Sequence, residues 1–341
     1  MKKHSRKKFQ YILYFGIAAI LFALSLTFFS KLCEPKYVTL SREGNLIGEY
    51  YKEADAGNRH DVIFIGDCEA YSSFIPPVMY EKYGIRSFVR GSPSQSIAQS
   101  YHLIRETLEY ETPSAVVFSV YAMCREGSAS EAYNRMTLDS MRLSSLKLDA
   151  VRESVLEDES IMSYYLPILR FHTRIYELED EDIKYLFRRP SVSHNGYFMQ
   201  KGEVAAENVD LPEGAAEPLP DVNFEYLDRM RTLCRDSGVE LILVKTPLCS
   251  WRYPWYEEWD SEIEDYAARH GLSYYNLIDS ADEIGIDMKS DSFDGGLHLN
   301  VYGAEKVSLF FGEILKEGHN ILGEKNNIWD EKVKRYYEER N

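Results

Sequence analysis

Residues 61–70 constrain the fold of this chain more than any other segment. The apolar run 62–65 predicts a fully buried strand, and Gly66, Asp67 and Cys68 follow it directly before a helix-compatible stretch. A glycine where a buried strand turns sharply into a helix permits backbone angles that a Cβ would forbid. The segment therefore predicts a strand–turn–helix unit of an α/β fold.

Cys68 follows this turn and is expected at the N-terminus of a helix. Unpaired N–H groups and the helix dipole favour negative charge there, so a thiolate would be stabilised. We therefore predict that Cys68 is a nucleophile that reacts well below the pH at which a free thiol ionises. A buried structural cysteine at the end of a strand is the alternative interpretation.

A second chemically suggestive segment lies near the other end of the chain. Residues 292–304 place Asp294 and His298 in a glycine-containing loop before a predicted helix at about 303–315. A histidine shortly after an aspartate, in a loop, suits an oriented general base beside a nucleophile.

Together the two segments resemble the SGNH/GDSL hydrolase superfamily over roughly residues 61–315. Gly66-Asp67-Cys68 is similar to its Gly-Asp-Ser block, with cysteine in place of serine, and Asp294 and His298 resemble its terminal Asp-x-x-His block. The resemblance implies a flavodoxin-like, three-layer α/β/α fold. It also implies that Cys68 attacks an ester carbonyl, that His298 transfers the proton and that Asp294 holds the imidazole.

The chain departs from the superfamily pattern at several positions. Asp294 precedes His298 by four residues instead of three, so Asp291 remains an alternative partner for the ring. The third block, Gly-x-Asn-Asp, is absent after the strand that ends near residue 120, which leaves Asn134 as a candidate source of an amide.

The resemblance further implies an oxyanion hole at the same edge of the sheet. Backbone N–H groups of Cys68 and Gly91 are its candidates, because Gly91 resembles the glycine of the second block. Asp67 is a further candidate for binding substrate there.

The rest of the chain alternates strands and helices, which predicts a doubly wound parallel sheet with its chemistry at the carboxyl ends of the strands. We expect a connector at 34–60, an α/β domain at 61–320 with an insertion at about 124–220, and a charged C-terminal tail at 321–341. The insertion is expected to form a cap or a partner-facing surface.

The N-terminus predicts a membrane anchor. Five basic residues lie among the first ten, and residues 11–29 contain no charge. As a helix these 19 residues span about 28 Å, enough for the bilayer core. The basic flank predicts a cytoplasmic N-terminus, a single pass over residues 1–33 and an extracytoplasmic domain. A cleaved signal peptide is the alternative.

Charge and cysteine content narrow the range of ligands. The formal net charge is −16, and it becomes −21 without the five N-terminal basic residues, which disfavours binding to nucleic acid. The five cysteines have no metal-like spacing, so we expect neither a metal site nor a cofactor. Cys124 and Cys249 are expected at the same sheet edge as Cys68, and a disulfide to Cys68 would abolish its role as a nucleophile.

Two functions of different class remain. The first is a membrane-anchored, extracytoplasmic acyl-ester hydrolase or O-acyltransferase that acts on acylated cell-envelope glycans or small esters. Membrane-bound O-acyltransferases are the partners that the resemblance implies. The second is a catalytically inactive scaffold of the same fold that binds a glycan or such a partner.

Overall fold

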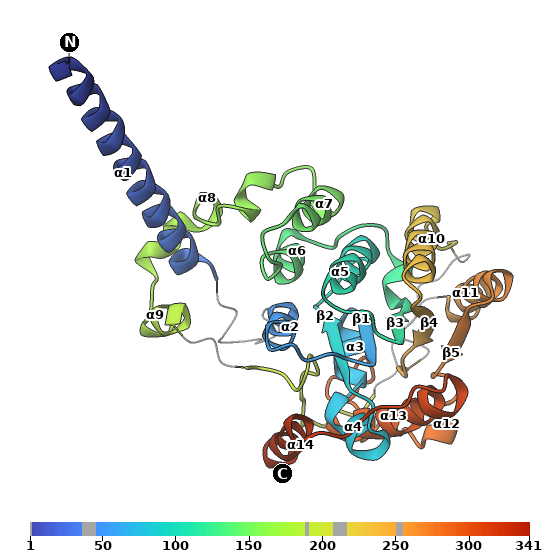
Figure 1. The fold of residues 1–341 in the computed structure, drawn as a ribbon. Helices are drawn as coiled ribbons and strands as arrows, with labels where there is room; N and C mark the ends of the chain where they lie inside the picture. The colour runs from blue at the N-terminus through green and yellow to red at the C-terminus, as the bar shows by residue number, and fades with distance from the viewer. Residues whose placement is uncertain (1, 36–45, 188–190, 207–216, 250–254) are drawn as a thin grey trace. The chain divides into compact units, whose positions relative to one another are not determined.

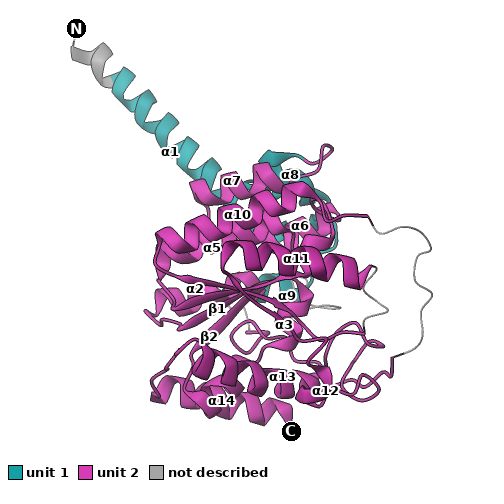
Figure 2. Cartoon of the chain, turned by 90° about the vertical axis from the view of Figure 1, so that its right-hand side faces the viewer, with its two compact units in different colours: residues 1–37, 160–190 teal, residues 38–159, 191–341 magenta. Residues whose placement is uncertain are grey.

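The computed structural model describes residues 2–35, 46–187, 191–206, 217–249 and 255–341. The chain divides into two compact units, which Figure 2 shows in different colours. Unit 1 comprises residues 1–37 and 160–190, and unit 2 comprises residues 38–159 and 191–341. The predicted insertion at 124–220 is therefore divided between the two units.

Unit 2 is built on a five-stranded parallel sheet with the strand order β2-β1-β3-β4-β5 (Figure 1). The strands are β1 (Val62–Gly66), β2 (Ser87–Gly91), β3 (Ala115–Ser119), β4 (Glu240–Lys245) and β5 (Ser273–Asn276). This topology confirms the predicted doubly wound fold. Its strand order reverses direction at β1, which is where such sheets place their ligands.

Helices cover both faces of the sheet (Figure 1). One face carries α5 (Ile97–Tyr110), α10 (Asp221–Asp236) and α11 (Tyr256–His270), and the other carries α3 (Cys68–Ser73), α4 (Pro76–Tyr83) and α13 (Val301–Glu313). On the second face Phe64 stacks on Phe74 with ring centroids 4.3 Å apart, and Phe74 contacts Phe311 at 5.3 Å. These rings join β1, α3 and α13 into one core.

Shorter elements complete unit 2. They are η2 (Val120–Cys124), α6 (Glu131–Leu138), α7 (Ser145–Ser154), α12 (Ala281–Ile284) and η6 (Ile314–Gly318). The expected connector and tail also contain helices, α2 (Leu46–Asp55) and α14 (Asn327–Arg340). Tyr50 and Tyr51 of α2 are buried, as are Trp329 and Tyr336 of α14, so both segments contribute aromatic side chains to the interior.

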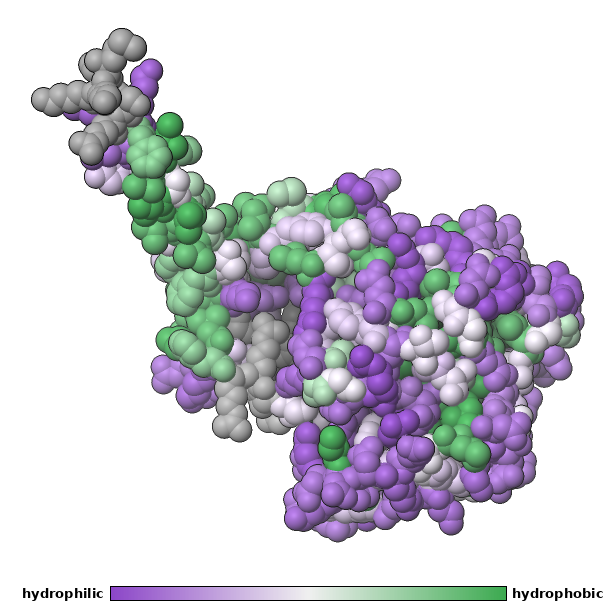
Figure 3. Space-filling view, in the orientation of Figure 1, coloured by the Kyte–Doolittle hydropathy of each residue, from purple (hydrophilic) through white to green (hydrophobic). Residues whose placement is uncertain are grey.

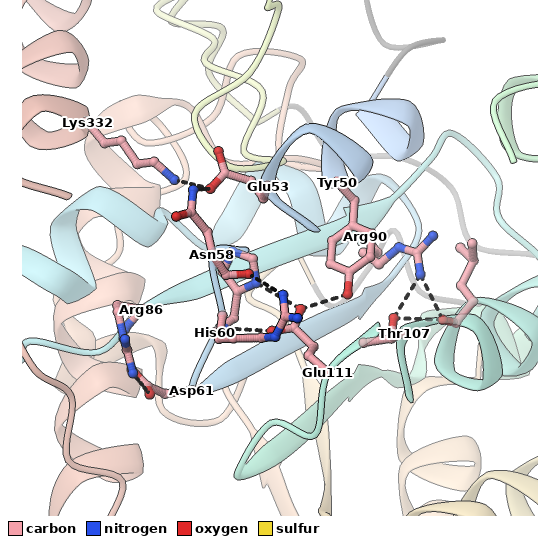
Figure 4. Close-up of polar contacts among 12 residues, drawn as sticks. Tyr50, Glu53, Asn58, His60, Asp61, Arg86, Arg90, Thr107, Glu111 and Lys332 are labelled. Atoms are coloured by element: carbon pink, nitrogen blue, oxygen red, sulfur yellow. Dashed lines mark hydrogen bonds and ion pairs between the residues drawn. The ribbon is translucent and has the colours of Figure 1, made fainter. Parts of the chain in front are cut away.

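A buried polar cluster fixes α2 to the sheet (Figure 4). We call it the α2–β2 cluster: Tyr50, His60, Arg90, Glu106 and Glu111. Glu111 accepts hydrogen bonds from the Tyr50 hydroxyl at 2.7 Å and from the His60 backbone N–H at 2.7 Å, and its carboxylate lies 2.9 Å from the His60 ring. Arg90 donates to Glu106 at 2.6 Å and lies 4.2 Å from the centre of the Tyr50 ring. Each charge in this cluster therefore has an oppositely charged or hydrogen-bonding neighbour.

Unit 1 combines a long N-terminal helix with short helices from the middle of the chain. They are α1 (Lys2–Cys33), η3 (Ile161–Tyr164), α8 (Ile168–Phe171), η4 (His172–Tyr176) and α9 (Asp180–Phe187). Among the described residues α1 is the helix long and apolar enough to cross a membrane, over Lys7–Cys33. Its surface is predominantly apolar (Figure 3).

Candidate active site

Cys68 begins helix α3 at the carboxyl end of strand β1, which lies between β2 and β3 in the sheet. Asp67 caps this helix, because its side chain accepts a hydrogen bond from the Glu69 backbone N–H at 3.2 Å. Gly66 has no positive φ. A Cβ at Gly66 would instead lie 2.7 Å from the Cβ of Ser119, so the glycine is needed for space rather than for a special backbone conformation.

The loop that carries His298 is shaped by two successive glycines. Gly295 and Gly296 have φ values of +81° and +94°, which other residues rarely adopt. The Ser292 hydroxyl accepts a hydrogen bond from the Gly296 N–H at 2.7 Å and so closes the turn. The turn that presents His298 is therefore formed by residues of the loop itself.

His298 is held by Asp294. The imidazole Nδ1 lies 2.5 Å from Asp294 Oδ2, and the His298 backbone N–H donates to Asp294 Oδ1 at 2.8 Å. Asp291 binds elsewhere: its Oδ2 accepts from Lys306 Nζ at 2.6 Å and from the Asp287 N–H at 2.8 Å. The alternative left open by the four-residue spacing is therefore decided in favour of Asp294.

The ring of His298 interacts electrostatically with the Cys68 thiol, so the structure brings Cys68, His298 and Asp294 together. The ring Nε2 is buried and forms no hydrogen bond of ordinary geometry. Burial lowers the pKa of His298, but the Asp294 hydrogen bond, the Cys68 thiol and Glu69 outweigh it and raise the pKa to about 12. The ring is therefore protonated at neutral pH.

The pKa of Cys68 shifts in the direction opposite to the prediction from sequence. Burial raises it, and the negative charges of Asp67 and Glu69 add to this, while the His298 ring only partly compensates. Helix α3 has six residues, and a carboxyl group precedes and follows its first position. The expectation that Cys68 ionises more readily than a free thiol is therefore wrong.

Glu69 is the residue of this site that the sequence analysis missed. It is 1% exposed, its Oε2 accepts from the Thr246 hydroxyl at 2.8 Å, and its Oε1 has no hydrogen-bond partner. This Oε1 lies 3.8 Å from Nε2 of His298. Burial, with the charge of Asp67 added, raises the pKa of Glu69 to about 8 although His298 opposes it. Its position directly after Cys68 is the feature of the sequence that could have identified it as a residue of the site.

Asp67 lies in the site as an acceptor of hydrogen bonds. One carboxyl oxygen caps α3, and the other lies 3.2 Å from a guanidinium nitrogen of Arg125. A carboxylate that accepts hydrogen bonds cannot stabilise an oxyanion. Arg125, directly after η2, contacts Asp67 and is the positively charged side chain of this site that could bind an anion.

The other two candidates for the oxyanion hole differ in their surroundings. Gly91 ends β2 in register with Gly66, and a Cβ there would lie 3.1 Å from the Gly66 carbonyl oxygen and 3.2 Å from that of Asp67. Asn134 donates both amide hydrogens, to the Ser154 carbonyl at 2.9 Å and to Glu159 at 2.8 Å. Asn134 therefore has no amide hydrogen left for a substrate, because it joins α6 to the segment after α7.

The cysteines at the site are free thiols. All five cysteines lie in the described residues, and none forms a disulfide. Cys249 lies against the His298 loop, since its N–H donates to the Gly296 carbonyl at 2.9 Å. No disulfide therefore locks Cys68 in this structure.

Comparison with known proteins identifies similar folds at low sequence identity. No family model and no curated protein matches the chain. A lipase/acylhydrolase from Enterococcus faecalis shares 11% identity over 76% of this chain and 97% of its own, with a TM-score of 0.40. A GDSL-like lipase from Bacteroides thetaiotaomicron shares 13% identity over 80% of this chain and 98% of its own, with a TM-score of 0.37. Similarity at this level assigns neither a family nor an activity.

Proposed function

We propose that this chain is a membrane-anchored acyl-ester hydrolase or O-acyltransferase that acts, outside the cytoplasm, on O-acyl groups of cell-envelope glycans. One observation carries the proposal: an Asp294–His298 pair of 2.5 Å beside the Cys68 thiol, at the carboxyl edge of the sheet. A nucleophile, a base and a residue that orients the base are the groups that acyl transfer requires. A membrane-bound O-acyltransferase is the proposed partner.

The reaction would proceed in two steps. Cys68 Sγ attacks the ester carbonyl carbon while His298 holds the thiol proton, and the ring then returns this proton to the departing alcohol oxygen. The result is a thioester on Cys68 and a free alcohol. In the second step water, or a glycan hydroxyl, loses a proton to His298 and attacks the thioester, which releases the acid or the new ester and restores the thiol.

The charges around the thiol determine when this chemistry can begin. Because the pKa of Cys68 is raised and that of His298 is raised to about 12, the pair of thiol and imidazolium holds both protons at neutral pH. Activity is therefore expected to increase into the alkaline range, where one proton leaves the pair and the thiolate–imidazolium form becomes populated.

A second candidate is a catalytically inactive scaffold that binds a glycan or a membrane protein. The raised pKa of Cys68 favours it, since the negative charges of Asp67 and Glu69 oppose formation of a thiolate. The occupied amide of Asn134 favours it too, because Asn134 then has no amide hydrogen with which to complete the oxyanion hole.

Ester hydrolysis by the full chain in detergent tests the proposal. We expect turnover of p-nitrophenyl acetate that increases between neutral pH and about pH 9, and its loss in Cys68→Ala and in His298→Ala. Cys234→Ala is the matched control, because Cys234 is a buried thiol on α10 and is expected to leave turnover within about twofold. Equal turnover in wild type and Cys68→Ala would favour the scaffold.

A further inference from the structure

Unit 1 contains an apolar surface that the ester chemistry does not use. Residues 160–187, here called the collar, form the short helices η3, α8, η4 and α9. Seven large apolar side chains of the collar are exposed: Ile161, Met162, Leu169, Ile175, Tyr176, Ile183 and Phe187. Tyr176 is 91% exposed and Phe187 is 84% exposed, which is unusual for side chains of this size in water.

The collar is attached to one end of α1. Large apolar side chains of α1 are exposed from Phe9 to Phe29, whereas Leu32 and Cys33 are buried. Arg174 of η4 donates to the backbone carbonyls of Cys33 at 3.0 Å and Glu34 at 2.9 Å. These are among the carbonyls that the end of a helix leaves without intrahelical partners, and a cation is favourable there.

A second contact of Arg174 extends this attachment to α9. Arg174 also pairs with Asp182 of α9 at 3.1 Å, and the Asp182 side chain is almost fully buried. One guanidinium therefore joins three elements of unit 1: the C-terminal end of α1, η4 and α9. The exposed apolar side chains of the collar are consequently held at a defined level along the axis of α1.

This level corresponds to a membrane–water interface. The charge-free stretch 11–29 spans about 28 Å, close to the thickness of a bilayer hydrocarbon core, so the turns that follow Phe29 lie at the headgroups. Tyrosine and phenylalanine are residue types that favour this region. The collar contains five acidic residues and three basic residues, so charge does not favour an anionic surface.

We propose that the collar lies in the outer headgroup–acyl boundary of the bilayer that α1 spans, and that the two together form one anchor. The partner is a lipid surface, bound through apolar side chains. We choose a lipid surface as the partner because the exposed apolar side chains of the collar continue the exposed apolar surface of α1 (Figure 3). The inference rests on the membrane-anchor part of the proposed function and is independent of Cys68.

Site-specific photo-crosslinking tests it with the full chain in nanodiscs of synthetic phosphatidylcholine. p-Benzoylphenylalanine replaces Phe22, Tyr176, Phe187 or Glu181 one at a time, and mass spectrometry measures lipid adducts on each peptide. Phe22 reports insertion of α1. Glu181 is the matched control, because it pairs with Lys184 on α9 and lies about 160° around the helix from Ile183.

We expect lipid adducts at Phe22, Tyr176 and Phe187 and at least fivefold fewer at Glu181, with yields unchanged between 0.1 and 1 M NaCl. Adducts at Phe22 without adducts at Tyr176 and Phe187 would overturn the collar but leave the anchor. Crosslinks from Tyr176 and Phe187 to a second copy of the chain would identify a protein interface instead. No adduct at Phe22 would overturn both the anchor and the collar, whereas ester hydrolysis in detergent would still be measured separately.

Discussion

Two buried glutamates in unit 2 have opposite electrostatic surroundings. Burial raises the pKa of Glu111, but hydrogen bonds and charge from His60, with the Tyr50 hydrogen bond, outweigh it and leave the pKa below its ordinary value. Burial also raises the pKa of Glu69, and there the neighbouring charge of Asp67 adds to the increase, which brings it to about 8. Glu111 is a buried anion with donors around it, and Glu69 is a buried acid with a second acid beside it.

The comparison distinguishes a buried cluster that stabilises the fold from a buried cluster at the candidate active site. In the α2–β2 cluster the carboxylates meet donors, so that the cluster stabilises the attachment of α2. At the candidate site three carboxyl groups, Asp67, Glu69 and Asp294, surround one thiol and one imidazole. Oε1 of Glu69 and Nε2 of His298 lie 3.8 Å apart, and neither atom forms a hydrogen bond of ordinary geometry. Such incompletely satisfied buried groups are typical of sites that perform chemistry.

The largest expected effect is on the functional side of this comparison. Asp294→Asn is predicted to reduce ester turnover by about 10⁴-fold, because the imidazole loses the carboxylate that fixes its orientation and stabilises its charge. Asp291→Asn is the matched control and is expected to retain turnover within about tenfold, since Asp291 binds Lys306. Steady-state hydrolysis of p-nitrophenyl acetate measures both, and a greater loss in Asp291→Asn would contradict the assignment.

The second prediction concerns stability in the α2–β2 cluster. Glu106→Ala is expected to lower the free energy of unfolding by about 3–5 kcal/mol, because Arg90 is fully buried and would lose its carboxylate. Glu109→Ala, at an exposed position of the same helix, is expected to change it by less than about 0.5 kcal/mol. Urea unfolding followed by circular dichroism compares them. Equal effects would show that the cluster does not stabilise the fold.

Glu111→Gln is predicted to remove a pH-dependent part of the stability. Because the folded-state pKa of Glu111 lies below its unfolded value of about 4.5, the contribution is complete above that pH and is lost as pH falls through the folded pKa. Near pH 7 we expect the variant to be about 1–2 kcal/mol less stable than wild type. The urea midpoints of wild type and Glu111→Gln should converge as the pH falls. A difference between the two midpoints that stays constant with pH would be inconsistent with a charged Glu111.

The smallest effect on stability is predicted for Glu69→Gln, and its pH dependence has the opposite sign to that of Glu111→Gln. Because the folded-state pKa of Glu69 is raised, wild type loses stability relative to the variant as pH increases from about 4.5 to about 8. Above about pH 8 the variant lacks a negative charge beside Cys68, so its thiol should ionise at a pH lower by up to about one unit.

Iodoacetamide alkylation of Cys68 against pH measures this shift, with Glu109→Gln as the control. Similar alkylation rates in wild type and Glu69→Gln below pH 8, and faster alkylation of Glu69→Gln above it, are the expected pattern. Slower alkylation at every pH would mean that Glu69 assists the thiol rather than opposing its ionisation.

The sequence alone predicted the alternation of strands and helices in a parallel sheet and the two segments that meet at the candidate site. Apolar periodicity and the residues around Cys68 and His298 are local properties, so they can be read before the chain is folded. The prediction that residues 11–29 span a membrane is equally local, because it depends only on length and composition. The helices α2 and α14 were missed, because the faces they bury are defined by the elements they pack against.

Only the tertiary structure decided which aspartate orients His298, how the thiol of Cys68 ionises and that Glu69 belongs to the site. It also divided the expected insertion and assigned residues 160–190 to the unit that contains α1. The physical reason is the same in each case. Desolvation, charge and contact act through space between residues far apart in the chain, so their balance exists only after the chain has folded.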